Sequence, residues 1–127
     1  MQNKIIILSG AGISAPSGIQ TFRDSDGLWE NHAIEDVCHI NSWVKNYDLV
    51  HKFYNQRRLQ LANIKPNKIH HTIAMWQNKY GVDRVINMTQ NVDNLFEKAN
   101  TPKTLHLHGF LTQVKCNSCG LVKDIGR

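Results

Sequence analysis

The sequence lacks any long apolar run. No stretch of its 127 residues approaches the roughly 20 apolar residues that a membrane-spanning helix requires. The apolar stretch that follows Lys4 is also too short for a signal peptide, and it leads into a glycine-rich turn as a strand would. We therefore expect a cytoplasmic protein without membrane contact.

Blocks of like charge are also missing. The formal net charge is +5, but the basic residues are spread from Lys4 to Arg127. Surfaces that bind nucleic acid concentrate lysine and arginine, so we expect no direct nucleic-acid binding. A phosphate-bearing cofactor or an acidic substrate group would use the same charge more locally.

Cysteine is scarce, with three in the chain. Cys38 stands alone, whereas Cys116 and Cys119 form a Cys-x-x-Cys pair. In a chain expected in the cytoplasm, such a pair indicates a metal site or a redox site more often than a structural disulfide.

The first half of the chain predicts a strand followed by helices. The β-branched run 5–8 predicts a parallel strand buried on both faces, and residues 10–29 predict a turn, a short helix and a loop. Apolar positions at helical spacing predict a helix over 47–62. A second helix is predicted from 67 to 80, and one face would carry four apolar residues: Ile69, Ile73, Trp76 and Tyr80.

The second half predicts further strands. Residues 82–88 read as a buried strand, 92–99 as a short helix, and 103–108 as a strand in which leucine alternates with histidine. A short strand through Leu111 and Val114 then leads into the cysteine pair. Strands and helices in this order favour an α/β fold with a parallel sheet.

A glycine-rich turn follows the first predicted strand. Residues 10–15 fit the G-x-G-x-x-G/A pattern, in which the backbone approaches a pyrophosphate held at a helix N-terminus. A plain tight turn has the same signature. The acidic residue expected about 20 positions further on is not evident, so the pattern alone leaves both interpretations open.

Polar clusters occur where the predicted strands end. They occupy residues 18–24 beside the glycine-rich turn, 89–93 after the second strand and 107–109 after the third. Ligands of open α/β sheets bind at the carboxyl ends of the strands. We therefore expect these clusters to meet in one crevice.

These motifs, taken in order, resemble the sirtuin family. The family pattern is close to GAGIS, GI-x-TFR, GLW, TQN-[IV]-D, HG and C-x-x-C, and each element is present in that order. The resemblance implies a Rossmann-like parallel sheet, incomplete on its C-terminal side, with a helical insert and half of a zinc-ribbon module. It assigns 1–30 and 82–109 to the Rossmann-like part, 31–81 to the insert and 110–127 to the start of the zinc module.

The resemblance also implies an activity. Such enzymes are NAD-dependent protein-lysine deacylases that move an acyl group from a protein lysine to ADP-ribose and release nicotinamide. NAD would be the cofactor and acyl-lysine proteins the partners. The expected partial domain favours impaired activity and self-association through an unfinished sheet edge. The alternatives are a non-catalytic NAD or ADP-ribose-binding remnant, and an NAD hydrolase or ADP-ribosyltransferase.

Site residues carry over from the family residue by residue. His108 would be the general base, because an imidazole exchanges a proton near neutral pH, although a strand histidine satisfied by the backbone is the simpler interpretation. Asn91 would orient the ribose or the attacking group, and Asp93 would receive the nicotinamide carboxamide. The full set of predicted cofactor-binding residues is Gly10, Ala11, Gly12, Ser14, Phe22, Arg23, Asp24, Trp29, Gln90, Asn91, Asp93 and His108.

Tyr54 and Arg57 lie three residues apart, on one face of the helix predicted over 47–62. The pair is similar to the Tyr-x-x-Arg pair with which one sirtuin class binds acidic acyl chains such as succinyl and malonyl. A guanidinium can bind a carboxylate through two hydrogen bonds. The simpler interpretation is a packed tyrosine and a solvated arginine, and the choice of Arg57 over Arg58 depends on the family register.

Cys116 and Cys119 resemble one half of a zinc ribbon. Structural zinc takes four ligands, usually from two such pairs, and the residues after Cys119 contain no further Cys or His. We expect zinc with an incomplete site, and a redox pair remains the alternative. His70 also matches a family position, and we expect it to hold the start of its helix.

Overall fold

The structure is a computed structural model that describes residues 3–21, 28–29 and 32–126. Its elements in chain order are β1 (Ile5–Ser9), η1 (Ala11–Ile13), η2 (Ala15–Ser17), β2 (Leu28–Trp29), β3 (His32–Ala33), α1 (Ile34–Val37), α2 (Ser42–Lys45), α3 (Tyr47–Asn63), α4 (Lys68–Tyr80), β4 (Val85–Thr89), α5 (Leu95–Lys98), β5 (Leu105–His106), β6 (Gln113–Lys115) and β7 (Val122–Asp124). None of the described helices is both long and apolar enough to cross a membrane. The cytoplasmic location stays a prediction.

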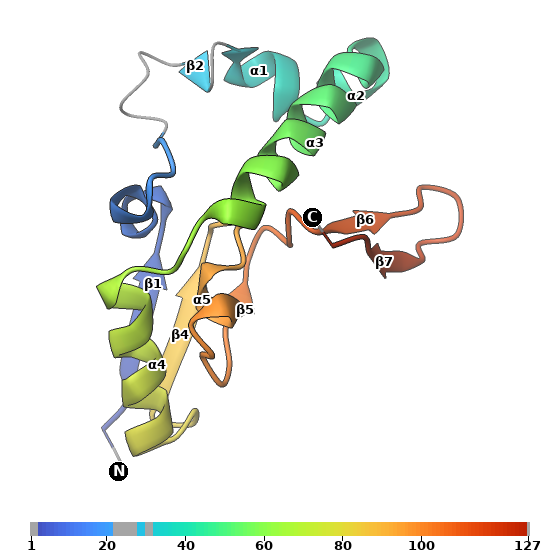
Figure 1. Cartoon of the computed structure of the whole chain (residues 1–127). Coiled ribbons are helices and arrows are strands. Elements are labelled where there is room, and N and C mark those ends of the chain that lie inside the picture. The colour runs from blue at the N-terminus through green and yellow to red at the C-terminus, as the bar shows by residue number, and fades with distance from the viewer. Residues whose placement is uncertain (1–2, 22–27, 30–31, 127) are drawn as a thin grey trace.

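A parallel sheet with the order β1-β4-β5 lies beside α4 and below α3 in the view of Figure 1. β1 pairs with β4 from Ile5 opposite Val85 to Ser9 opposite Thr89, and β4 pairs with β5 at its end. The antiparallel pairs β2–β3 and β6–β7 lie outside this sheet. The predicted α/β fold with a parallel sheet is therefore confirmed.

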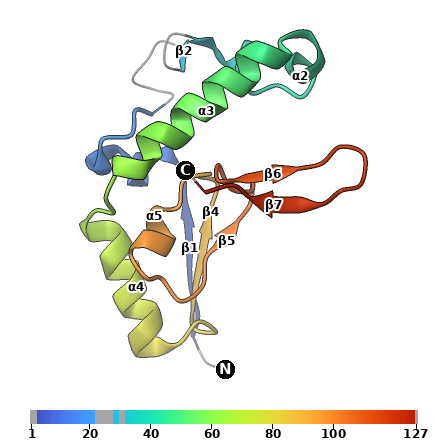
Figure 2. The same ribbon diagram turned by 45° about the vertical axis from the view of Figure 1, so that its right-hand side comes forward.

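Helices α4 and α5 cover one face of the sheet (Figure 2). Along β4 the side chains of Val85, Asn87 and Thr89 are buried, whereas those between them are half-buried. Gln77 of α4 connects the layers, because its side-chain nitrogen donates to the carbonyls of Val85 and Lys103, each at 2.8 Å. The buried layer thus contains polar side chains that have backbone partners.

The opposite face of the sheet is apolar and exposed. Ile6 is 63% exposed and Leu8 is 60% exposed. Parallel register places them beside Ile86 and Met88, and Met88 beside Leu105. The prediction of a first strand buried on both faces is therefore wrong for the described residues. A β-branched run indicates a strand suited to burial, but it does not supply the layer that would cover it.

The apolar stripe predicted for the second helix is also largely wrong. Of its four residues only Ile73 is buried, whereas Trp76 is 38% exposed. The buried face of α4 is formed by His70, Ile73, Ala74 and Gln77. The polar contacts of His70 and Gln77 orient α4 on the sheet, and a hydrophobic pattern does not register such contacts.

Two further predictions differ from the structure in detail. The strand predicted over 103–108 is shorter, and Leu105 and Leu107 are exposed. The side chain of His106 is the buried one. The short helix predicted after the first strand is a pair of 3-10 turns, η1 and η2, with a proline in the first turn of η2.

The start of α4 is anchored by Asn67 and His70. The Asn67 side-chain oxygen accepts from the Ile69 amide at 2.9 Å, and His70 Nδ1 accepts from the Asn67 amide at 3.3 Å. These reciprocal bonds form a capping box, which confirms the structural role expected for His70. Asn67 Nδ2 also donates to the Ile13 carbonyl at 2.8 Å and to Ser17 Oγ at 2.9 Å. One side chain therefore joins α4 to the 3-10 segment.

We expect Asn67→Ala to lower the free energy of unfolding by about 2 to 3 kcal/mol, because the cap and two further hydrogen bonds are lost. Asn78→Ala is the matched control on the same helix, since its side chain bonds the Ala74 carbonyl of that helix. Urea unfolding of both variants measures the difference. Equal losses would show that Asn67 is not an anchor.

Acidification should destabilise the chain through His70. Burial lowers the pKa of His70 more strongly than the charge of Asp93 raises it. In the unfolded chain His70 takes up a proton near the ordinary histidine pKa of about 6.5, whereas in the folded chain it stays neutral to a lower pH. This contribution to stability is complete above pH of about 6.5 and is lost as the pH falls toward the lowered pKa of the folded state.

His70→Gln tests this prediction, because glutamine keeps a capping-box acceptor but does not titrate. We expect the unfolding free energy to fall less between pH 7.5 and 5.5 in the variant than in the wild type. The other histidines are common to both proteins and cancel in the comparison. Identical pH dependences would contradict the prediction.

Candidate active site

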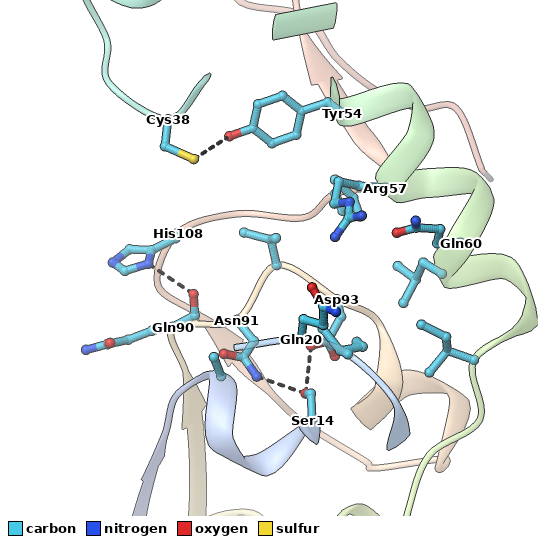
Figure 3. A pocket seen from close by; sticks show the side chains of 16 residues that line it. Ser14, Gln20, Cys38, Tyr54, Arg57, Gln60, Gln90, Asn91, Asp93 and His108 are labelled. Carbon is cyan, nitrogen blue, oxygen red and sulfur yellow. Dashed lines mark hydrogen bonds between the residues drawn. The ribbon is translucent and has the colours of Figure 1, made fainter. Parts of the chain in front are cut away.

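A cavity of about 400 Å³ lies where β1 and β4 end, beneath α3 (Figure 3). Eight of the residues predicted for the site line this cavity, and they are Ala11, Ser14, Tyr54, Arg57, Gln90, Asn91, Asp93 and His108. They come from the segment after β1, the loop after β4, the segment after β5 and one face of α3. The polar clusters at the strand ends therefore meet in one crevice, as predicted.

Ser14 connects the segment after β1 with the loop after β4. Its hydroxyl donates to Asp93 Oδ2 at 2.8 Å and accepts from Asn91 Nδ2 at 3.0 Å. Asp93 Oδ1 accepts from the Leu95 amide at 3.1 Å at the start of α5. Because Ser14 and Asp93 are buried, these bonds supply the partners that a buried carboxylate requires. The network fixes the Asn91 side chain at the cavity wall.

His108 is held by the same loop. Its Nδ1 lies 3.0 Å from the Gln90 carbonyl oxygen. A carbonyl oxygen only accepts, so Nδ1 carries the proton in the neutral imidazole and Nε2 keeps its lone pair. His108 is an exposed residue at the cavity, so this lone pair is accessible to a ligand. The arrangement is the one that a general base needs.

The glycine-rich turn contributes Ala11 to the cavity, and its role as a phosphate cradle stays a prediction. Gly10 and Gly12 do not line the cavity, and neither has a positive φ, whereas Gly18 has φ of 92° where η2 ends. A Cβ at Gly10 or Gly12 would meet no atom of the described residues within 4 Å. The segment is two 3-10 turns, so the helix that was expected to hold a phosphate at its N-terminus is not formed here.

Four predicted cofactor residues cannot be placed. Phe22, Arg23 and Asp24 lie outside the described residues. Trp29 belongs to β2, but its side chain is not among those described. Their roles stay predictions.

The structure distinguishes the two arginines of α3. Arg57 is 8% exposed and lines the cavity together with Tyr54. Arg58 instead donates from Nε to the Leu111 carbonyl at 2.7 Å and from a terminal nitrogen to Asn55 Oδ1 at 2.8 Å. Arg57 therefore faces the site, and Arg58 connects α3 to the segment before β6. The alternative of a solvated Arg57 does not hold.

Cys38 and Gln60 also line the cavity, and the sequence analysis assigned neither to the site. The Tyr54 hydroxyl donates to Cys38 Sγ at 3.8 Å, and burial raises the pKa of both groups, so both are neutral at pH 7. Nothing in the sequence pattern marks Cys38. Gln60 lies three residues after Arg57, on the same face of α3, so helical spacing would have found it.

Cys116 and Cys119 lie in the turn between β6 and β7, and both are exposed. A hydrogen bond from the Cys119 backbone, followed by one from Ser118, lowers the pKa of the Cys116 thiol. This favours the thiolate that a metal ligand requires. Within the described part of the chain, no group of three or more His, Cys, Asp or Glu residues could hold a metal ion. The pair therefore supplies two ligands without a closed site.

Comparisons with known proteins agree with this geometry. A sequence model described as the Sir2 family matches residues 10–126. An NAD-dependent protein deacylase of Campylobacter jejuni is 48% identical over 122 residues, which are 96% of this chain and 52% of the relative. A protein of Leishmania major that is also named an NAD-dependent protein deacylase is 50% identical over 128 residues, covering 95% of this chain and 53% of its own.

Solved structures give the same result. A Sir2 homologue in complex with NAD has a TM-score of 0.83 at 35% identity, over 98% of this chain and 48% of the other. A variant of a Sir2 homologue in complex with ADP-ribose has a TM-score of 0.85 at 35% identity, over 98% of this chain and 49% of the other. The chain thus spans about half the length of the proteins that it matches. By its family match, its relatives and its fold, the chain belongs to the Sir2 family, the sirtuins.

Proposed function

We propose that this chain carries the nicotinamide side and the acyl side of an NAD-dependent protein-lysine deacylase. The observation that carries the proposal is the single cavity lined by His108, Asn91 and Asp93 on one wall and by Tyr54 and Arg57 on the other. The names of the relatives support the same activity. The complete reaction belongs to proteins of about twice this length, so the activity of the chain by itself is part of the proposal.

The polar wall of the cavity fits the cofactor. NAD, when bound, supplies the ADP-ribose that accepts the acyl group and the nicotinamide that leaves. His108 offers Nε2 as the acceptor of a proton from a ribose hydroxyl, because its Nδ1 is engaged with Gln90. Asn91 is held by Ser14, so its side chain is oriented before a ligand binds. Asp93 faces the same space and can accept hydrogen bonds from a carboxamide.

The opposite wall fits an acyl-lysine whose acyl chain ends in a carboxylate. Arg57 is a buried cation at the cavity, and its guanidinium carbon lies 5.6 Å from the centre of the Phe53 ring. A succinyl or malonyl carboxylate could bind this guanidinium through two parallel hydrogen bonds. The neutral Tyr54 hydroxyl would add a third by turning its one proton from Cys38 Sγ to the carboxylate. We therefore propose desuccinylase or demalonylase activity beside deacetylation.

For zinc we propose a more limited role. Cys116 and Cys119 would supply two of the four ligands of a structural site, and the lowered pKa of Cys116 supports that assignment. The described residues do not supply the remaining ligands. No catalytic step depends on this metal.

The exposed apolar sheet face favours a second candidate, an NAD-binding or ADP-ribose-binding module without turnover. Such a surface usually marks a contact with another segment or chain. NAD hydrolysis in the same cavity is a further outcome that the assays below would reveal. Self-association through this face also stays a proposal.

His108→Ala tests the proposed reaction. The purified chain is incubated with NAD and an acetyl-lysine or succinyl-lysine peptide, and nicotinamide and O-acyl-ADP-ribose are measured. We expect turnover to fall at least about 100-fold, because general-base catalysis contributes about that much. His71→Ala, an exposed position on α4, is the matched control and should leave turnover unchanged.

The other outcomes separate the candidates. NAD binding without product would support the non-catalytic module. Nicotinamide release without peptide would indicate NAD hydrolysis. Turnover that survives in His108→Ala would contradict the assigned base.

Arg57→Met tests the acyl preference. We expect kcat/KM for a succinyl-lysine peptide to fall at least about 10-fold more than kcat/KM for an acetyl-lysine peptide, because only the former loses a charge-assisted bidentate contact. Arg58→Met is the matched control, since that guanidinium bonds Leu111 and Asn55. It should change both substrates alike. Equal losses in Arg57→Met would exclude an acidic-acyl site.

A further inference from the structure

His106 is a buried histidine that the proposed reaction does not use. It is the last residue of β5, and its side chain is 2% exposed. Its Nδ1 lies 3.1 Å from the Asn91 carbonyl oxygen, and its Nε2 lies 2.9 Å from Glu97 Oε1 of α5. The ring packs on Phe110 with centroids 3.8 Å apart. It therefore bridges the loop after β4 to α5.

Both partners of the ring are acceptors. A carbonyl oxygen has no proton to donate, and neither does an ionised carboxylate. A neutral imidazole has one N–H group, so it can donate to only one of the two acceptors and directs a lone pair at the other acceptor. The imidazolium donates at both nitrogens and satisfies Asn91 and Glu97 together. The geometry therefore selects the charged form.

The charged groups around the ring act in the same direction. Burial lowers the pKa of His106, but the hydrogen bond and charge of Glu97, the Asn91 carbonyl and the charge of Asp93 together outweigh it and raise the pKa. Glu97 faces the ring from α5, and Asp93 lies in the loop after β4. Among the residues that the structure describes, no cation contributes to this shift.

Asn91 is held at three polar positions. Its amide donates to Thr89 Oγ1 at 3.1 Å, and its side chain donates to Ser14 Oγ at 3.0 Å. The bond from His106 reaches its carbonyl. A chain of hydrogen bonds therefore runs from Glu97 through His106 and Asn91 to Ser14. Asn91 and Ser14 line the cavity, whereas Glu97 does not.

His106 and His108 take different roles for a geometric reason. Each directs Nδ1 at a carbonyl of the same loop, His106 at Asn91 and His108 at Gln90. His108 keeps Nε2 open to the cavity, whereas Glu97 occupies Nε2 of His106. His106 is therefore unsuited to act as a base but well placed to hold the loop.

We propose that His106, as an imidazolium paired with Glu97, is a positioning residue that holds Asn91 through its backbone carbonyl. Deprotonation removes one of the two bonds and loosens the connection between α5 and the Asn91 loop. The part of the inference that concerns catalysis rests on the proposed deacylase function, whereas the pairing itself does not. The site should accordingly lose positioning as the pH rises through the pKa of His106.

The first test is nitrogen NMR of the histidine rings in the chain, with Glu97→Gln as the variant. In the wild type at pH 7 both nitrogens of His106 should carry protons, and the Asn91 carbonyl carbon should shift with the titration of the ring. Glu97→Gln should lower the titration midpoint by about one pH unit or more. Glu35→Gln, an exposed glutamate on α1, is the matched control and should leave the midpoint in place.

The second test is the pH dependence of kcat and KM in the NAD assay. Glu97→Gln should move the alkaline limb of kcat to lower pH, because it destabilises the imidazolium, with a smaller change in KM for NAD. His106→Leu should lower kcat about 10-fold or more. His106→Gln keeps one donor for the Asn91 carbonyl, so it should recover part of the lost kcat, but its pH profile should lack the alkaline limb.

The two tests separate the inference from the proposed function. A His106 ring with one bare nitrogen at pH 7, or a midpoint unaffected by Glu97→Gln, overturns the inference whatever the activity. Correct NMR behaviour without turnover in any variant supports the pairing and counts against the deacylase. Turnover whose pH profile is the same in Glu97→Gln and wild type overturns the positioning role.

Discussion

The parallel pairing of β1 with β4 is the constraint on which the rest of the structure depends. It aligns Ser9 with Thr89, so the segments that follow both strands begin side by side at one edge of the sheet. Ser14 and Asp93 then come within hydrogen-bonding distance although 79 positions separate them in the chain. A shift of one residue in this register would turn the side chains of β1 to the opposite face and break the network.

The helices adapt to that edge through polar contacts. Asn67 joins the start of α4 to Ile13 and Ser17, and Gln77 joins its last turns to β4 and the segment before β5. Each of these side chains meets backbone groups from two or more elements. Such contacts are costly to leave incomplete in a buried layer, so they determine which face of α4 meets the sheet.

Much of this arrangement followed from the chain order of the motifs. The parallel sheet was predicted from the order of strands and helices, and α3 and α4 from apolar positions at helical spacing. The meeting of Ser14, Asn91, Asp93 and His108 was predicted because strand ends converge in open α/β sheets. The covered second face of β1 and most of the apolar stripe of α4 were not found, and the short helix after the glycine-rich turn is a pair of 3-10 turns. In each case a packing partner was inferred from a local sequence pattern, but the whole fold determines which segments pack against each other. The pairing of Tyr54 with Cys38 could not be predicted, because it joins two segments of the insert that carry no shared signal.

The sequence by itself determined the family, the kinds of chemical group at the site and their order along the chain, because these depend only on residue identity and spacing. The tertiary structure alone decided which partners the two histidine rings bond. His106 and His108 are the same residue type, two positions apart, with the same kind of partner at Nδ1. Their difference is the Glu97 carboxylate, which α5 brings to Nε2 of His106, and its position follows from how α5 packs and not from the residues of the strand.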